Sequence, residues 1–242
     1  MRRIISRTRA AVDDYKMIAD GDKIAVGVSG GKDSLLLLKA LCELKRFYPA
    51  KFTIVAITLD MRFGCEDGDF SAIKEMCDSY GVEYVVKPTD LYEIIFEVRK
   101  EPNPCSLCAR MRRGILHDTA KELGCNKIAL GHHLDDAIET FYMNLWNEGR
   151  IGTFSPVTYL SIKDITMIRP FVLAIEQDVI RAVNEIQMPI VESKCPADGV
   201  TNRQNIKNWV MDRCREDTSF RAKSLNAFQK KDLDGWGLKN KG

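Results

Sequence analysis

The sequence lacks any apolar run that approaches the roughly 18 residues needed to span a bilayer. Its arginine-rich start has no apolar segment behind it that resembles a signal peptide. No internal repeat and no low-complexity block interrupts the 242 residues. These absences argue against membrane, secreted and repeat proteins, and we expect a cytoplasmic protein with one sizeable hydrophobic core.

The chain also lacks a strong excess of either charge sign, because its net charge is only +2. So small a charge does not by itself predict a nucleic-acid partner, but the basic residues are unevenly distributed. They gather in three groups: Arg2, Arg3, Arg7 and Arg9; Arg99, Lys100, Arg110, Arg112 and Arg113; and Arg203, Lys207, Arg213, Arg215, Arg221 and Lys223. Solvated surfaces and an RNA-binding surface are both open interpretations.

Cysteine, by contrast, is abundant, with eight residues, which in a cytoplasmic chain are expected to be reduced or ligated. Cys105 and Cys108 form a C-x-x-C pair, and Cys195 lies far along the chain. A structural zinc site normally has four protein ligands, whereas a 4Fe-4S cluster held by three cysteines leaves one iron open. A metal site, a redox dithiol and two ordinary cysteines at a helix start remain open. The others are predicted to be buried thiols: Cys42, Cys65, Cys77, Cys125 and Cys214.

Apolar runs rich in β-branched residues alternate with helical patterns along the chain. Strands are predicted over 23–28, 52–59, 83–87, 127–131 and 166–170, and helices over 34–47, 69–80, 107–123, 135–147 and 176–186. This alternation predicts an α/β fold, with a parallel sheet, helices on both faces and ligand sites at the carboxyl ends of the strands.

Changes in composition suggest three parts of the chain. A basic N-terminal segment (1–20) precedes a main domain (21–186) that contains the C-x-x-C pair. A small C-terminal extension (187–242) carries Cys195 and is predicted to end in a loose tail from about Asp232.

The segment Ser29-Gly30-Gly31-Lys32-Asp33-Ser34 stands where the first strand turns into a helix. Glycines let backbone N–H groups approach phosphate oxygens, while the helix N-terminus adds positive potential and Lys32 a full charge. The spacer of the G-x-x-x-x-G-K-S/T loop is missing, so a different phosphate cradle is predicted; an ordinary strand-to-helix turn is the alternative. Asp60, after the second strand, and His132 to Asp136, after the fourth, should gather beside it.

This segment resembles the PP-loop of the N-type ATP pyrophosphatases, which cut ATP between its α and β phosphates. The cysteine region reads Pro104-Cys-Ser-Leu-Cys-Ala-Arg-Met-Arg-Arg-Gly-Ile-Leu116, and the fourth strand leads into Gly131-His-His-Leu-Asp-Asp-Ala-Ile-Glu-Thr140. With Ile168-Arg-Pro170 and with Arg203-Gln204 after Cys195, these motifs resemble the tRNA 2-thiocytidine synthetases of the TtcA type, relatives of the TtuA-type thiolases. The likeness covers nearly the whole chain.

The resemblance implies an adenine nucleotide α-hydrolase-like fold and an enzyme that uses ATP, Mg²⁺ and a 4Fe-4S cluster. Such an enzyme replaces the C2 oxygen of a cytidine in the tRNA anticodon loop, expected at position 32, by sulfur. It implies a cluster on Cys105, Cys108 and Cys195, ATP contacts from Ser29, Gly30, Gly31, Lys32, Asp33, Ser34, Asp60 and Gly131, and catalytic roles for Lys32, Asp33, Arg112 and Asp136. It also implies tRNA and a sulfur donor, of the cysteine-desulfurase type or another, as partners, no membrane, and a homodimer.

Some of these roles have alternatives. Arg112 lies four residues after Cys108, on the same helix face, where TtuA-type enzymes carry a lysine; a guanidinium can steady a phosphate but cannot give up a proton as a lysine does. For Asp135 and Asp136 the alternative is helix capping. His132 and His133 are expected to be structural residues rather than cluster ligands.

Three other functions remain open at this stage. One is a different PP-loop tRNA modification, such as 2-thiouridine or lysidine formation, although the cysteines favour thiolation over lysidine formation. Another is an ATP-dependent amidating synthetase, which needs an ammonia source and no RNA-sized basic surface. The last is an RNA-binding or zinc-binding module without catalytic turnover. Metal analysis after anaerobic purification would indicate such a module if it found zinc and no iron.

Overall fold

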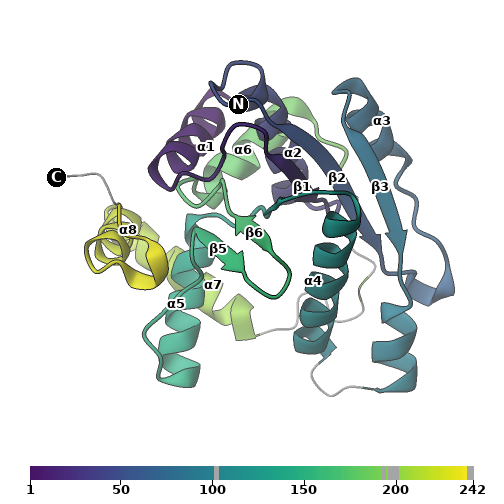
Figure 1. The fold of residues 1–242 in the computed structure, drawn as a ribbon. Coiled ribbons are helices and arrows are strands. Elements are labelled where there is room, and N and C mark those ends of the chain that lie inside the picture. Colours follow the sequence, from purple (N-terminus) through teal and green to yellow (C-terminus); the bar gives the residue numbers. More distant parts are fainter. Residues whose placement is uncertain (101–103, 192–194, 196–201, 239–242) are drawn as a thin grey trace.

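The computed structural model describes residues 1–100, 104–191, 195 and 202–238, which wrap helices round one twisted sheet (Figure 1). In chain order the elements are α1 (Arg2–Asp14), β1 (Lys23–Gly27), α2 (Lys32–Lys45), β2 (Thr53–Asp60), η1 (Phe63–Cys65), α3 (Ser71–Ser79), β3 (Glu83–Pro88), η2 (Glu93–Val98), α4 (Pro104–Glu122), β4 (Lys127–Ala129), α5 (Leu134–Glu148), β5 (Val157–Leu160), β6 (Ile165–Ile168), α6 (Glu176–Ile186), α7 (Asn202–Glu216), α8 (Phe220–Lys230) and η3 (Leu233–Gly235). All ten predicted strands and helices are present, with ends shifted by a few residues.

The sheet has the strand order β3-β2-β1-β4-β6-β5. The first five strands in this order are parallel, which confirms the predicted α/β fold. The prediction missed β5, which pairs antiparallel with β6 at the edge, with Val157 opposite Ile168. From β1 the chain adds β2 and β3 on one side of the sheet and then returns to add β4 on the other side. The carboxyl ends of β1 and β4 therefore flank a topological switch point, the place where sheets of this kind bind ligands.

The central strands β1 and β2 are buried on both faces, as is typical of parallel strands. Successive residues of β1 point to opposite faces: Ile24 and Val26 join the larger core, whereas Ala25 joins a smaller one. Leu116 and Ala120 of α4 close the smaller core, so α4 covers this face in front of the sheet (Figure 1). Because α4 is anchored here, its first turns project beyond the carboxyl ends of the strands.

The N-terminal and C-terminal parts of the chain share the larger core with the central part. Ile4 and Val12 of α1 are buried in it, and so are Ile206 of α7 and Phe228 of α8. The segments 1–20 and 187–242 therefore do not build separate cores among the described residues.

The prediction of a loose tail from about Asp232 is wrong for the part that the structure describes. The turn η3 brings Trp236 into the core, where its side chain is 0% exposed. Its Nε1 donates to the Phe154 carbonyl oxygen at 2.8 Å, and its ring meets Tyr15 edge-on at 6.0 Å. Residues 239–242 lie outside the described part.

Within the described ranges, no helix combines the length and the apolar character that crossing a membrane requires.

Candidate active site

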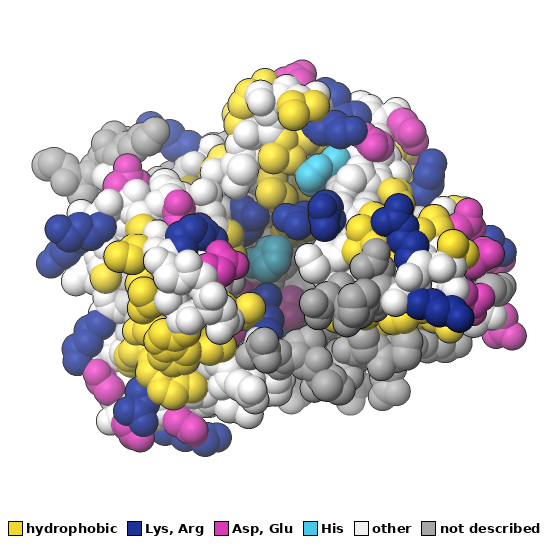
Figure 2. Space-filling model, turned by 90° about the horizontal axis from the view of Figure 1, so that it is seen from below, with side chains coloured by type: hydrophobic (Ala, Val, Ile, Leu, Met, Phe, Trp, Pro, Cys, Tyr) yellow, Lys and Arg dark blue, Asp and Glu magenta, His cyan; other side chains and the backbone are white. Residues whose placement is uncertain are grey.

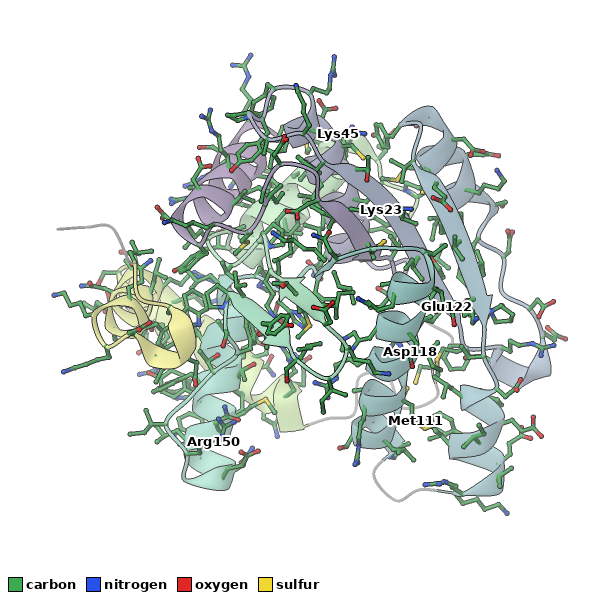
Figure 3. All side chains as sticks on the ribbon, viewed as in Figure 1. Lys23, Lys45, Met111, Asp118, Glu122 and Arg150 are labelled. Carbon is green, nitrogen blue, oxygen red and sulfur yellow. The ribbon has the colours of Figure 1, made fainter. Side chains whose placement is uncertain are left out.

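A cavity of about 610 Å³ opens at the carboxyl ends of the central strands, a size typical of small-molecule sites. It is lined from the β1–α2 loop, the end of β4, the first turns of α4, the end of β6 and the start of α7. Its described lining includes Ser29, Gly31, Asp33, Ser34, Ala109, Arg112, Arg113, Gly131, His132, Asp136, Phe154, Arg169 and Arg203. Figure 2 shows this hollow with Lys, Arg and His side chains gathered round it.

The β1–α2 loop is tied into a tight cradle. Ser34 Oγ donates to the Gly31 carbonyl at 2.9 Å and accepts the Ser29 N–H at 3.1 Å. Gly30 has φ of +83°, a left-handed conformation that favours glycine, and its carbonyl accepts the Val191 N–H at 3.1 Å. Gly31 precedes α2 as its N-cap residue and has no side chain that could accept from the helix. The first N–H groups of α2 are therefore not capped by it and can bind an anion.

Lys32 is held by carboxylates beside this cradle. Its Nζ lies 2.9 Å from Asp33 Oδ2 and 3.2 Å from Glu176 Oε1, and Glu176 also binds Lys207 of α7 at 2.6 Å. Burial alone would lower the pKa of Lys32, but Asp33 and Glu176 outweigh it and raise this pKa. The ammonium therefore stays charged, and Glu176 has a second cationic partner in Lys207.

The end of β4 approaches the cradle closely at Gly131. A Cβ atom on this residue would lie 3.0 Å from the carbonyl carbon and oxygen of Asp33. The absence of a side chain therefore lets β4 and the start of α2 share one wall of the cavity.

Asp136 caps the start of α5, as the alternative interpretation predicted, and it also lines the cavity; its catalytic role stays a prediction. Its Oδ2 accepts the His133 N–H at 2.9 Å while His133 Nδ1 accepts the Asp136 N–H at 3.3 Å, a capping box at the start of α5. Its Oδ1 accepts from Arg203 Nη2 at 2.6 Å. Burial would raise the pKa of Asp136, but His133 and Arg203 outweigh it and lower this pKa, so the carboxylate at the cavity is ionised.

The carboxylates of Asp135 and Asp60 hold neighbouring segments of the fold together through hydrogen bonds. Asp135 accepts the Glu176 N–H at 2.8 Å and Arg221 Nε at 2.6 Å, which joins α5 to α6 and α8. Asp60 Oδ1 accepts the Arg62 N–H and Oδ2 the Gly68 N–H, both at 2.9 Å. Asp60 is not among the described residues that line the cavity, and its contact with ATP stays a prediction.

Cys105 and Cys108 occupy the first turn of α4, which begins three residues earlier than predicted, at Pro104. Cys105 is exposed, whereas Cys108 packs with Met61, Leu91 and Ile95. Burial raises the pKa of the Cys108 thiol; Arg112 opposes this, and Cys195 and Cys105 raise the pKa further. The three thiols are therefore electrostatic neighbours, although their sequence positions lie far apart.

The donor chemistry of these three thiols suits an iron–sulfur cluster. Across the ranges that the structure describes, no three Cys, His, Asp or Glu side chains converge to hold one ion. In a cluster each cysteine binds a different iron, so its ligands are neighbours without converging on one point. Cys42 and Cys77 suit inert positions, since burial raises the pKa of Cys42 to about 11 and that of Cys77 to about 12. The side chain of Cys65 lies outside the described part.

Sequence reasoning assigned no role to Arg169, Arg113, Phe154 or Glu176, which the structure brings to the site. One signal was present for Arg169, because an arginine at the end of a buried strand breaks the apolar pattern. For Glu176 no local signal existed, since it lies far along the chain from Lys32 and meets it only because α6 packs against α2.

His132 should make the free energy of unfolding of the protein depend on pH. Burial lowers its pKa from 6.5 to about 4. Between these values the unfolded chain binds the proton and the folded chain does not, so stability falls as the pH falls. By pH 5 this histidine should remove roughly 2 kcal/mol of unfolding free energy.

Urea unfolding of the wild type and of His132→Gln at about pH 7.5 and pH 5 measures this effect. The variant should lose roughly 2 kcal/mol less than the wild type on acidification. Equal losses would show that His132 is not held neutral in the folded state.

Comparison with known proteins supports this architecture. The PP-loop domain family matches residues 3–214. A tRNA-cytidine(32) 2-sulfurtransferase of Pelobacter propionicus is 38% identical over 230 residues, covering 94% of this chain and 85% of that protein. One of Geobacter sulfurreducens is 37% identical over 230 residues, covering 94% of this chain and 89% of that protein.

Among solved structures, the U34-tRNA thiolase NcsA from Methanococcus maripaludis with its 4Fe-4S cluster is similar in fold. It has a TM-score of 0.74 at 22% identity and covers 93% of this chain and 77% of that chain. This likeness confirms the predicted fold.

Proposed function

Because the chain belongs to the PP-loop family and, within it, to the tRNA-cytidine(32) 2-sulfurtransferases, we propose that it makes 2-thiocytidine in tRNA. The observation that carries this proposal is that the cavity beside the phosphate cradle is also lined by Arg112, the neighbour of the cysteine thiols. The phosphate cradle forms one wall, and Arg112, one helical turn after Cys108, lies on another. Activation of a base and delivery of sulfur would then take place at the same cavity.

The reaction needs the C2 oxygen of cytidine to become a leaving group. The oxygen attacks the α-phosphorus of ATP, and the bond from this phosphorus to the bridging oxygen breaks, which releases pyrophosphate. A sulfur nucleophile then adds to C2 of the adenylated base. The C2–O bond breaks, AMP departs with the original oxygen, and sulfur remains on the base.

The cradle supplies electrostatic stabilisation for the first step. The N–H groups at Gly30, Gly31 and the start of α2 would bind the β and γ phosphates, and Lys32 would offset the charge that develops on the departing pyrophosphate. We propose Mg²⁺ as a further counter-charge, with Asp33 at the cavity wall as its carboxylate contact or as a residue that positions substrate.

The cysteines would hold a 4Fe-4S cluster on Cys105, Cys108 and Cys195. When bound, such a cluster supplies one iron without a protein ligand, which can hold a sulfur ligand near the cavity. Arg112 neighbours these thiols and would steady the phosphate of the adenylated base through its planar guanidinium. Asp136, ionised and paired with Arg203, would accept a hydrogen bond or a proton from the acceptor base.

Three partners complete the proposal. The acceptor is tRNA, and the sulfur comes from a donor of the cysteine-desulfurase type or from another sulfide source. We further propose that the enzyme works in the cytoplasm as a homodimer.

Mass spectrometry of tRNA nucleosides from cells that lack this protein tests the function. We expect 2-thiocytidine to disappear and to return when the wild-type chain is expressed again. Unchanged 2-thiocytidine would overturn the proposal, whereas loss of 2-thiouridine alone would assign the chain to another tRNA thiolation.

A further inference from the structure

Arg169, which directly follows β6, is a buried cation without a carboxylate partner among the described residues; it is only 6% exposed. Its Nη1 donates to the Ser155 carbonyl and, at 3.3 Å, to Thr158 Oγ1, and its guanidinium carbon lies 4.9 Å from the centre of the Phe154 ring. Its buried Nε has no hydrogen-bond partner. A buried charge left in this state is unfavourable, so the guanidinium is fixed in place but lacks the anion that would neutralise it.

Two further arginines make this side of the cavity more positive. Arg112 and Arg113 of α4 line it and likewise have no carboxylate partner in the described ranges. Burial, and then Arg113, lower the pKa of Arg169 to about 10, which leaves it charged at neutral pH. Like charges in one cavity repel each other, and this arrangement favours the binding of an anion.

His132 places a neutral polar group beside this charge. Its ring lies 5.2 Å from that of Phe154, so His132 and Arg169 contact the same aromatic side chain. Its Nδ1 is buried and has no hydrogen-bond partner. A nucleotide needs both kinds of contact, because its phosphate is an anion and its base edge offers neutral donors and acceptors.

The position of Arg169 in the sheet separates it from the phosphate cradle. The cradle follows β1, and Arg169 follows β6, with β4 between them. Neighbouring strands lie about 4.8 Å apart, so the two strand ends are separated by about 10 Å. We assign the β and γ phosphates of ATP to the cradle and Lys32. The guanidinium of Arg169 is therefore free to bind the other reactant, the acceptor nucleotide.

We propose that Arg169, Phe154 and His132 form the subsite for the acceptor nucleotide, in which Arg169 binds a phosphodiester oxygen of the RNA. Arg113 adds positive charge at its rim, and His132 contacts the base edge. This inference rests on the proposed function to the extent that the acceptor is RNA.

Binding of tRNA to the purified, cluster-containing enzyme tests the inference, with fluorescence anisotropy measured over a range of salt concentrations. We expect Arg169→Gln to weaken binding by about tenfold or more and to reduce the slope of log K against log salt by about one. Arg169→Lys should recover part of the affinity, because it keeps the charge but not the fork geometry. The KM for ATP should stay unchanged in both.

Two more variants keep the test decisive if Arg169→Gln folds poorly, which circular dichroism and thermal melting will show. Arg113→Gln, an exposed change on α4, should weaken tRNA binding in the same direction by a smaller factor. Arg46→Gln removes an exposed arginine at the end of α2, where it pairs with Glu43, and should bind tRNA as the wild type does.

Each other outcome counts against the inference. Wild-type affinity in Arg169→Gln and Arg113→Gln would overturn it while leaving the proposed function intact. A raised KM for ATP with unchanged tRNA binding would assign the guanidinium to the nucleotide and overturn it too. If the wild type itself fails to bind tRNA, the proposed function and this inference fall together.

Discussion

Serine in place of Cys105, Cys108 or Cys195 is expected to abolish sulfur transfer and the binding of iron, while ATP binding and the fold remain. The replacement removes one thiolate and changes almost no volume, and Cys105 is exposed. Mutation of residues that only support metal ligands already costs about 10- to 100-fold in affinity or activity, so loss of a ligand should cost at least as much.

Anaerobically purified variants should be assayed for iron, acid-labile sulfide, ATP binding and 2-thiocytidine formation. Cys214→Ser is the matched control, because this half-buried thiol lies on α7 and burial raises its pKa. It should keep wild-type iron content and activity. Full iron in Cys195→Ser would exclude this residue as a ligand, and zinc in place of iron in the wild type would contradict the cluster itself.

The sequence alone was enough for the α/β fold and for a tight glycine-containing turn between β1 and α2, because both depend on local patterns. That this turn binds phosphate stays a prediction. Buried parallel strands read as β-branched apolar runs, and two glycines before a lysine mark a strand-to-helix turn. The antiparallel strand β5 was not predicted, because only four residues pair and most of them are half-exposed. Neither the length of the segment nor an alternation of buried and exposed residues indicated a strand.

Contacts between distant parts of the chain account for the remaining differences. Trp236 is buried because Tyr15 and Phe228 receive its ring, a contact that no local pattern near the C-terminus can show. Arg203 reaches Asp136 across 67 positions, so the charge state of the candidate catalytic carboxylate depends on α7. The C-terminal part thus completes the active site in addition to carrying Cys195.

The cradle itself is tested by Gly30→Ala, which we expect to lower tRNA-dependent pyrophosphate release by about 100-fold, since a displacement of about 1 Å at a reacting site costs about this much. Gly30 has φ of +83°, where an L residue is strained by about 1–2 kcal/mol. Its new Cβ would lie 2.9 Å from Val191 Cβ. The Val191 N–H is bonded to the Gly30 carbonyl, so neither residue can yield without moving the N–H groups that we expect to bind the phosphates.

Gly21→Ala separates this clash from backbone strain. Gly21 has nearly the same φ, +82°, but no atom lies within 4 Å of the Cβ that alanine would add. Gly21→Ala should lose about 1–2 kcal/mol of unfolding free energy in urea from backbone strain alone. Gly30→Ala should lose more, because the clash with Val191 adds to the strain, and only Gly30→Ala should lose pyrophosphate release. Equal activity losses would mean that strain anywhere in the fold inactivates the enzyme, and full activity in Gly30→Ala would place the β and γ phosphates elsewhere. The expected difference between two glycines of the same conformation therefore isolates what the close packing of Val191 on Gly30 contributes to catalysis.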